Sequence, residues 1–221
     1  MKHAVAFLTY VCLAATACAD LFIIQEMKSP MMNGEIFIKI KGDKMRLDMA
    51  FGPAGAMSTL IDTVSGDTTT LIHAQRMALK MPGAQLRQTM EALQKQAGGA
   101  KPAPPKPTGK TEKVGEYNTE IYTWAANGTT QTLWIAKDFP NYSKLKPHLK
   151  RLHDSPMAGP GKGMSPDLDA LPGMVVKMEG SIAGQKVSMT VVSVKETNFD
   201  AGIFETPADY QTIAQPGLPP P

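Results

Sequence analysis

The sequence predicts a mainly β domain in which a curved antiparallel sheet, a half-barrel, is covered by two short helices. Three observations predict it: segments where apolar and polar residues alternate, turn dipeptides between those segments, and only two stretches with helical spacing. About ten to twelve short strands are expected, and a sheet of that size curls because strand twist accumulates. A two-sheet β-sandwich is the alternative, since strand order along the chain does not exclude it.

The amino terminus, residues 1–19, has the features of a secretory signal peptide. Lys2 gives a basic start, an apolar run follows, and small residues lead to a cleavage site between Ala19 and Asp20. The run is shorter than a membrane-spanning helix requires. The alternative is a lipobox, in which a lipidated Cys18 tethers the protein to a membrane. We therefore expect an exported protein, periplasmic or extracellular, with no transmembrane segment in the mature chain.

A meander of short strands is expected to open the mature chain. Residues 44–49 alternate strictly between apolar and polar, and residues 35–41 do so with only Phe37 breaking the pattern. The dipeptide Gly42–Asp43 between these two segments is typical of a tight hairpin. Further strands are expected at 57–63, 68–73 and 76–81. The apolar positions of the first two segments share one face, and they are candidates for an apolar groove or for the core beneath it: Ile36, Ile38, Ile40, Met45, Leu47 and Met49.

A helix is expected over residues 84–96, where Leu86, Met90 and Leu93 form one apolar stripe. The Pro- and Gly-rich stretch 98–109 predicts a linker. Strands are then expected at four further places, the last with Val192 and Val194 on the face opposite Val191: 120–124, 130–137, 174–181 and 185–195.

A second helix is expected over residues 142–153, with Asn141 as its cap and Pro147 kinking or breaking it. The Gly/Pro-rich stretch 155–173 predicts an irregular loop, and 214–221 a disordered tail. These segments lie within or beside one predicted domain, 20–213.

Short motifs spread over the mature chain resemble a family of secreted bacterial proteins catalogued only as a domain of unknown function. That family is similar in turn to the periplasmic carriers of outer-membrane lipoproteins. The resemblance implies an unclosed antiparallel barrel whose concave, apolar face is covered by helices, and it leaves the function open. The motifs are Lys44–Asp48, Leu60–Asp62, Leu71–Ile72, Met81–Pro82, Leu133–Asp138, Gly173–Glu179 and Phe204–Tyr210.

Composition and motifs exclude several function classes. Lys and Arg total 23 against 20 for Asp and Glu, a surplus too small to indicate a nucleic-acid partner. Both cysteines lie in the first 18 residues, so neither a disulfide framework nor a cysteine metal site is expected downstream. No serine-hydrolase elbow, phosphate-binding loop or helical His/carboxylate pair occurs. We expect no enzyme, no catalytic or metal site and no cofactor, and Asp43, Asp48, Asp62 and Asp67 are expected at turns or on exposed strand faces.

Two further features bear on binding. The chain has 15 methionines, many in its first half, and flexible thioether side chains suit either plain core packing or an adaptable groove for acyl chains. The second helix is the most basic stretch, which is typical of a solvated face or of a surface that meets anionic lipid headgroups. The candidates for membrane or partner contact are Trp134, Tyr142, Lys144, Lys146, Lys150 and Arg151.

The sequence thus predicts a non-enzymatic domain that binds or carries a lipid or an acylated protein in an apolar groove. The alternative is a structural or protein-interaction module of the cell envelope, with Trp124, Trp134 and Tyr142 as anchors. An exposed aromatic patch would favour the alternative. Neither the ligand nor the oligomeric state follows from the sequence.

Overall fold

The computed structural model describes residues 20–30, 33–50, 55–96, 103–126, 129–154, 166–182 and 184–214. Everything predicted for residues 1–19 lies outside this part of the chain, as do residues 98–102 of the predicted 98–109 linker, residues 155–165 of the predicted loop and residues 215–221 of the predicted tail. Asp20 is the first described residue and begins a strand. Among the described residues, no helix is both long and apolar enough to cross a membrane.

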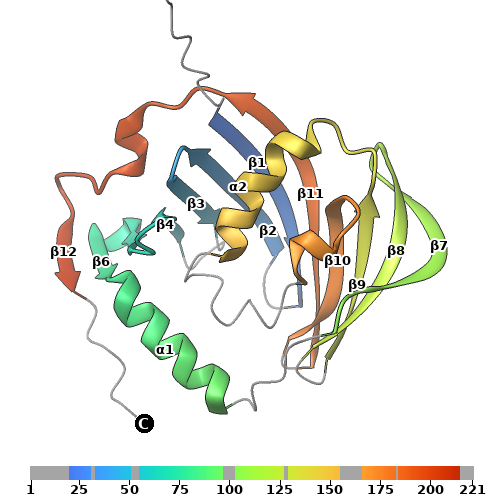
Figure 1. Ribbon diagram of the computed structural model, residues 1–221. Coiled ribbons are helices and arrows are strands. Elements are labelled where there is room, and N and C mark those ends of the chain that lie inside the picture. The colour runs from blue at the N-terminus through green and yellow to red at the C-terminus, as the bar shows by residue number, and fades with distance from the viewer. Residues whose placement is uncertain are drawn as a thin grey trace, which may run out of the picture.

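A single twelve-stranded sheet forms the domain, and it curves around a central helix (Figure 1). The strands of the first half are β1 (Asp20–Lys28), β2 (Asn33–Lys41), β3 (Lys44–Ala50), β4 (Ala56–Asp62), β5 (Thr68–Ile72) and β6 (Met77–Met81). Those of the second half are β7 (Lys106–Val114), β8 (Tyr117–Ala126), β9 (Thr129–Ala136), β10 (Met174–Ile182), β11 (Gln185–Thr197) and β12 (Gln211–Ala214). The predicted curved antiparallel sheet with helical cover is confirmed, and the sandwich alternative is wrong.

Two meanders make up the sheet, and they join where β1 pairs with β11. The strand order is β12-β6-β5-β4-β3-β2-β1-β11-β10-β9-β8-β7, antiparallel throughout except for the parallel β12–β6 pair at one edge. In the described chain β12 and β7 are therefore the two free edges, and the barrel stays open. Ile23 of β1 is 1% exposed and pairs with both Ile38 and Val194, so the junction lies in the core.

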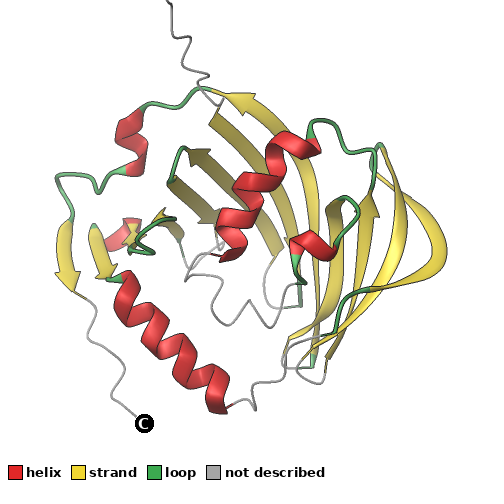
Figure 2. Ribbon diagram, in the orientation of Figure 1, coloured by secondary structure: helices red, strands yellow, loops and turns green. Residues whose placement is uncertain are grey.

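In the described residues, two α-helices and three short 3₁₀ helices accompany the sheet (Figure 2). Helix α1 (Gly83–Gln96) follows β6, and α2 (Tyr142–Asp154) crosses the face of the sheet around which the strands curve. The 3₁₀ helices are η2 (His73–Gln75), η5 (Leu168–Ala170) and η6 (Ala201–Phe204). A glycine is required where α1 begins, because a Cβ on Gly83 would lie 2.1 Å from the Ser65 carbonyl oxygen.

In the second half, the structure differs from the prediction in β7, α2 and β11, and it adds the unpredicted strand β12. Residues 106–109, predicted as linker, begin β7, whose Lys- and Pro-rich sequence suits a solvated edge strand. Helix α2 runs on through Pro147, which has no N–H to donate to the Ser143 carbonyl, so the predicted break does not occur. A bulge at residues 191–193 of β11 returns Val194 to the face of Val191 and leaves Val192 52% exposed.

Candidate functional site

Apolar side chains from five strands line up across the face of the sheet that carries α2. Consecutive register pairs place Ile36 opposite Met49, Met49 opposite Met57, Met57 opposite Ile72, and Ile72 opposite Met77. We call these five residues the methionine row. Ile36 is buried, but the other four are half-buried, so apolar side-chain surface remains accessible along most of the row.

The neighbouring rows on the same face are packed more tightly. Ile40, Met45 and Ile61 form a row in which no side chain is more than 4% exposed. Between it and the methionine row, Ile38 is 4% exposed and its partner Leu47 is half-buried. Burial thus falls from the row of Met45 toward the methionine row, where an apolar ligand would find surface not already covered.

The six residues predicted to line a groove or the core beneath it fall into two groups by their burial. Four of them, Ile36, Ile38, Ile40 and Met45, are core residues, whereas Leu47 and Met49 pack half-buried against that core. The sequence analysis did not single out Met57, Ile72 and Met77 as site residues. Their signal was present, because each lies in a predicted strand, but their shared face follows only from the strand register.

Helix α2 is held to the core by its apolar side. Leu145 is 4% exposed, and Tyr142 and Leu149 pack half-buried against the same cluster that contains Ile36, Ile38 and Met45. These three residues are spaced three and four apart, so they lie on one face of the helix. The helix therefore covers part of the sheet face on which the methionine row lies.

Each predicted basic contact residue of α2 is engaged in an ion pair within the domain. Lys144 lies 3.9 Å from Glu196 of β11, Lys146 and Lys150 lie 3.2 and 2.7 Å from Asp169 of η5, and Arg151 lies 3.1 Å from Asp43. The two lysines hold the pKa of the exposed Asp169 carboxyl below its ordinary value. These charges tie α2 to three separate segments around the apolar face.

The two tryptophans lie inside the domain. Trp124 is 2% exposed and donates to the Ala103 carbonyl at 2.9 Å. Trp134 is 6% exposed, donates to Glu112 Oε2 at 2.8 Å, and has the Lys177 ammonium 4.1 Å from its ring centroid. The two tryptophans provide no exposed aromatic patch. Of the residues predicted to contact a membrane or partner, Trp134 is buried, and the others all lie on α2.

A polar network occupies the opposite face of the first meander, which includes the side chains of Arg46 and Asp48. Asp48 accepts hydrogen bonds from Lys39 Nζ at 2.5 Å, Arg46 Nε at 2.7 Å and Ser58 Oγ at 2.5 Å. Burial alone would raise the pKa of Asp48, but these donors outweigh it and hold the pKa below its ordinary value. The exposed strand position predicted for Asp48 is wrong, because the C-terminal segment covers this face.

The hydrogen bonds of the network determine the tautomer of His73. Ser58 has one hydroxyl proton and gives it to the carboxylate of Asp48, so Ser58 Oγ accepts from His73 Nε2 at 2.7 Å. In the neutral imidazole with its proton on Nε2, His73 Nδ1 is the acceptor of the Tyr210 hydroxyl at 2.6 Å. Arg46 Nη1 also reaches the Ile203 carbonyl of η6 at 2.8 Å. Both contacts fasten the C-terminal segment to the sheet.

This Ser–His pair is not arranged for nucleophilic chemistry. Ser58 is 1% exposed, and its oxygen is already engaged by Asp48, His73 and, at 3.0 Å, Arg46 Nη2. A substrate has no path to that oxygen, and the histidine donates to the serine instead of accepting its proton. Within the described ranges, no group of three or more His, Cys, Asp or Glu side chains is placed to hold a metal ion.

Comparison with solved structures finds distant similarities. LppX from Mycobacterium tuberculosis is 9% identical, with 82% of this chain and 90% of that chain covered and a TM-score of 0.43. A LolA superfamily protein from Nitrosomonas europaea is 7% identical, with 85% and 89% covered and a TM-score of 0.32. PNGF-II is 14% identical with a TM-score of 0.42; 89% of this chain is covered, but it spans only 31% of PNGF-II.

Sequence comparison identifies the family. No curated protein matches the chain significantly. One family matches residues 23–210, from Ile23, the fourth residue of β1, to Tyr210, which bonds His73, and thus nearly the whole described domain. The chain therefore belongs to the family described as a domain of unknown function, DUF4412.

Proposed function

We propose that this protein binds the acyl chain of a lipid, or of an acylated protein, along the methionine row on the face of the sheet that carries α2. The observation that carries the proposal is the half-burial of Met49, Met57, Ile72 and Met77 in one continuous row. A row that crosses five strands is about 19 Å long, since neighbouring strands lie about 4.8 Å apart. That length suits an extended acyl chain.

The composition of the row favours a flexible apolar ligand. Methionine side chains are unbranched and polarisable, so they adapt to ligands of varied shape. No ionisable side chain belongs to the row, and a desolvated headgroup or charged substrate would find no partner there. On this proposal the protein acts by burying its ligand and performs no chemistry on it.

A fluorescent fatty acid titrated into the purified full chain tests this proposal. We expect saturable binding by the wild type and a loss of at least tenfold in affinity for Met57→Asp and Met77→Asp, because a carboxylate in the row repels the ligand carboxylate and leaves the acyl chain beside a charge. Lys80→Asp is the matched control, since Lys80 is exposed on the same strand as Met77, and it should bind as the wild type does.

The variant Met45→Asp distinguishes a residue needed for folding from a residue needed only for ligand binding. Met45 is 1% exposed, so a charge there should unfold the domain, as seen by far-UV circular dichroism. Met57→Asp, at a half-buried position, should keep the wild-type spectrum while binding is lost. Wild-type protein that takes up no fatty acid, or a folded Met57→Asp protein that binds normally, would contradict the proposal.

A further inference from the structure

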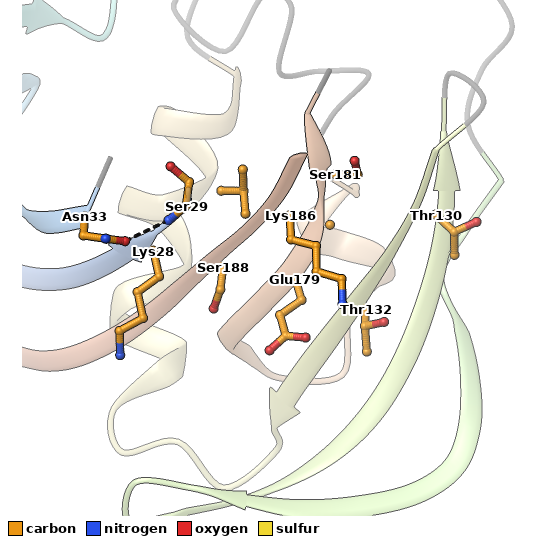
Figure 3. A pocket seen from close by; sticks show the side chains of 11 residues that line it. Lys28, Ser29, Asn33, Thr130, Thr132, Glu179, Ser181, Lys186 and Ser188 are labelled. Carbon is orange, nitrogen blue, oxygen red and sulfur yellow. Dashed lines mark hydrogen bonds between the residues drawn. The ribbon is translucent and has the colours of Figure 1, made fainter. Parts of the chain in front are cut away.

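A second concave site lies at the hairpin ends of β1, β2, β9, β10 and β11 (Figure 3). Its volume is about 550 Å³, within the range of small-molecule sites. Apart from Gly180 and Val187, the residues that line it are of polar type: they include Lys28, Lys186, Glu179 and several residues with hydroxyl groups. We refer to it as the hairpin pocket.

Strand register explains why these polar groups converge. One row across the sheet pairs Asn33 with Lys28, Lys28 with Ser188, Ser188 with Glu179, and Glu179 with Thr132. The next row pairs Lys186 with Ser181. Neighbours across a pair have Cβ atoms about 5 Å apart, so short hydroxyl side chains and long lysines stand side by side on one face.

The hairpin pocket carries a positive charge. Glu179 lies 2.7 Å from Lys177, and Lys28 lies 2.8 Å from Glu26, so both of these charges have a partner of opposite sign. Lys186 has no carboxylate within ion-pair distance in the described part of the chain, and it is exposed. In Figure 3 the Lys186 side chain points toward the side of the pocket where Thr132 and Glu179 lie.

From this arrangement we propose that the hairpin pocket binds a phosphate ester of a hydroxylated carbon skeleton, such as glycerol phosphate or a sugar phosphate. The free Lys186 ammonium meets the phosphate charge, and serine and threonine hydroxyls serve as donors and acceptors for the ligand hydroxyls. Among the described residues that line the pocket none is aromatic, so the proposed recognition involves no stacking on a sugar ring. Recognition rests on charge and hydrogen bonds, and binding weakens as salt increases.

The hairpin pocket is separate from the methionine row. Lys28 follows Met27 and Ser188 precedes Met189 along their strands, and both methionines pack against the core cluster that contains Ile36 and Leu145. Because successive side chains of a strand point to opposite faces, Lys28 and Ser188 face away from that cluster. Phosphate binding and acyl-chain binding therefore succeed or fail independently.

Titration of the isotope-labelled full chain with glycerol 3-phosphate, followed by amide chemical shifts, tests the proposal. We expect saturable shifts at the β10–β11 hairpin ends and about a tenfold weaker affinity for Lys186→Gln. Lys195→Gln is the matched control, because Lys195 is an exposed lysine farther along the same strand and outside the pocket. It should keep wild-type affinity, and glycerol without phosphate should produce no saturable shift.

Vesicles separate the two sources of such a ligand. Flotation with phosphatidylglycerol vesicles but not with phosphatidylcholine vesicles, lost in Lys186→Gln, would identify a lipid headgroup; binding of soluble glycerol 3-phosphate alone would identify a free phosphate ester. Absence of binding to both probes would overturn the proposal. Equal weakening by Lys186→Gln and Lys195→Gln would overturn it as well, since it would show only a general effect of net charge.

Discussion

Asp48 shows how one side chain fastens distant parts of this molecule together. Its carboxylate takes donors from β2, β3 and β4, and two of those donors, Arg46 and Ser58, continue the network to Ile203 and to His73 with Tyr210. The side chain is only 21% exposed, so these charge-assisted bonds are poorly replaced by water. We infer that Asp48 contributes to stability by orienting the donors that hold the C-terminal segment.

Replacement of Asp48 by Asn should lower the free energy of unfolding by about 2 kcal/mol at pH 7, because Lys39 and Arg46 then lose a charged acceptor. The pKa of Asp48 is lowered in the folded state, so its stabilising effect is present above its unfolded pKa and is lost as pH falls through the folded pKa. Urea unfolding at pH 7 and below pH 4 measures this, and the difference between the two proteins should shrink in acid.

Asp209→Asn provides the control for that experiment. Asp209 lies in the same C-terminal segment, and its 3.5 Å ion pair with Arg76 is exposed on both sides. Its replacement should change stability by less than about 0.5 kcal/mol. If Asp48→Asn and Asp209→Asn lower the free energy of unfolding equally, the hydrogen-bond network of Asp48 stabilises the protein no more than an exposed ion pair does.

At the scale of the element, α2 is held by the buried Leu145, by the half-buried Tyr142 and Leu149, and by ion pairs at the surface. The ion pairs are individually weak, whereas Leu145 is buried in the core. His148 works against this attachment. Its Nδ1 is buried without a hydrogen-bond partner in the described chain, and burial, with Arg151 beside it, lowers the pKa of His148. Its protonation therefore disfavours the docked helix.

His148→Gln should accordingly raise the melting temperature at pH 5 relative to the wild type and change it less at pH 7.5. The sign follows from linkage: a histidine with a lowered folded pKa takes up its proton more readily when unfolded, so stability falls as pH drops below about 6.5, the unfolded value. Thermal unfolding by circular dichroism at both pH values checks it. An equal shift at the two pH values would mean that the substitution acts by packing alone.

At the scale of the whole molecule, the β1–β11 pair joins two meanders into one sheet, and we propose that residues 20–213 unfold as one unit. Trp124 and Trp134 lie in the second meander, so tryptophan fluorescence reports on that meander. Far-UV circular dichroism reports on both meanders. Urea unfolding should give coincident transitions for the two probes. Two separated transitions would show instead that the meanders are independent.

The sequence predicted what alternation within a strand determines. The shared face of Ile36, Ile38 and Ile40, and the matching face of Met45 and Leu47, are confirmed by the β2–β3 register. Strand β7 was missed because lysine, proline and glycine dominate an exposed edge strand as they do a loop. No local pattern announces the β1–β11 pair or the parallel β12–β6 pair, because both join residues far apart in the chain.

The candidate site was predicted only in part for the same reason. Alternation placed Met49 on the correct face, but extension of the row to Met57, Ile72 and Met77 depends on three successive registers. The network was missed because Tyr210 and His73 are 137 residues apart and look unremarkable singly. The sequence indicated a solvated or lipid-facing surface for the lysines of α2, because nothing near them in the sequence reveals their partners Asp169 and Glu196. These lysines are Lys144, Lys146 and Lys150.

Native mass spectrometry, combined with lipid extraction, of the protein purified gently from the cells that make it tests the central claim most directly. The account predicts a stoichiometric adduct with the mass of an acyl lipid or lipopeptide in the wild type, and its loss in a folded Met57→Asp protein. A wild-type protein that is empty as isolated and stays empty after incubation with fatty acid would contradict it.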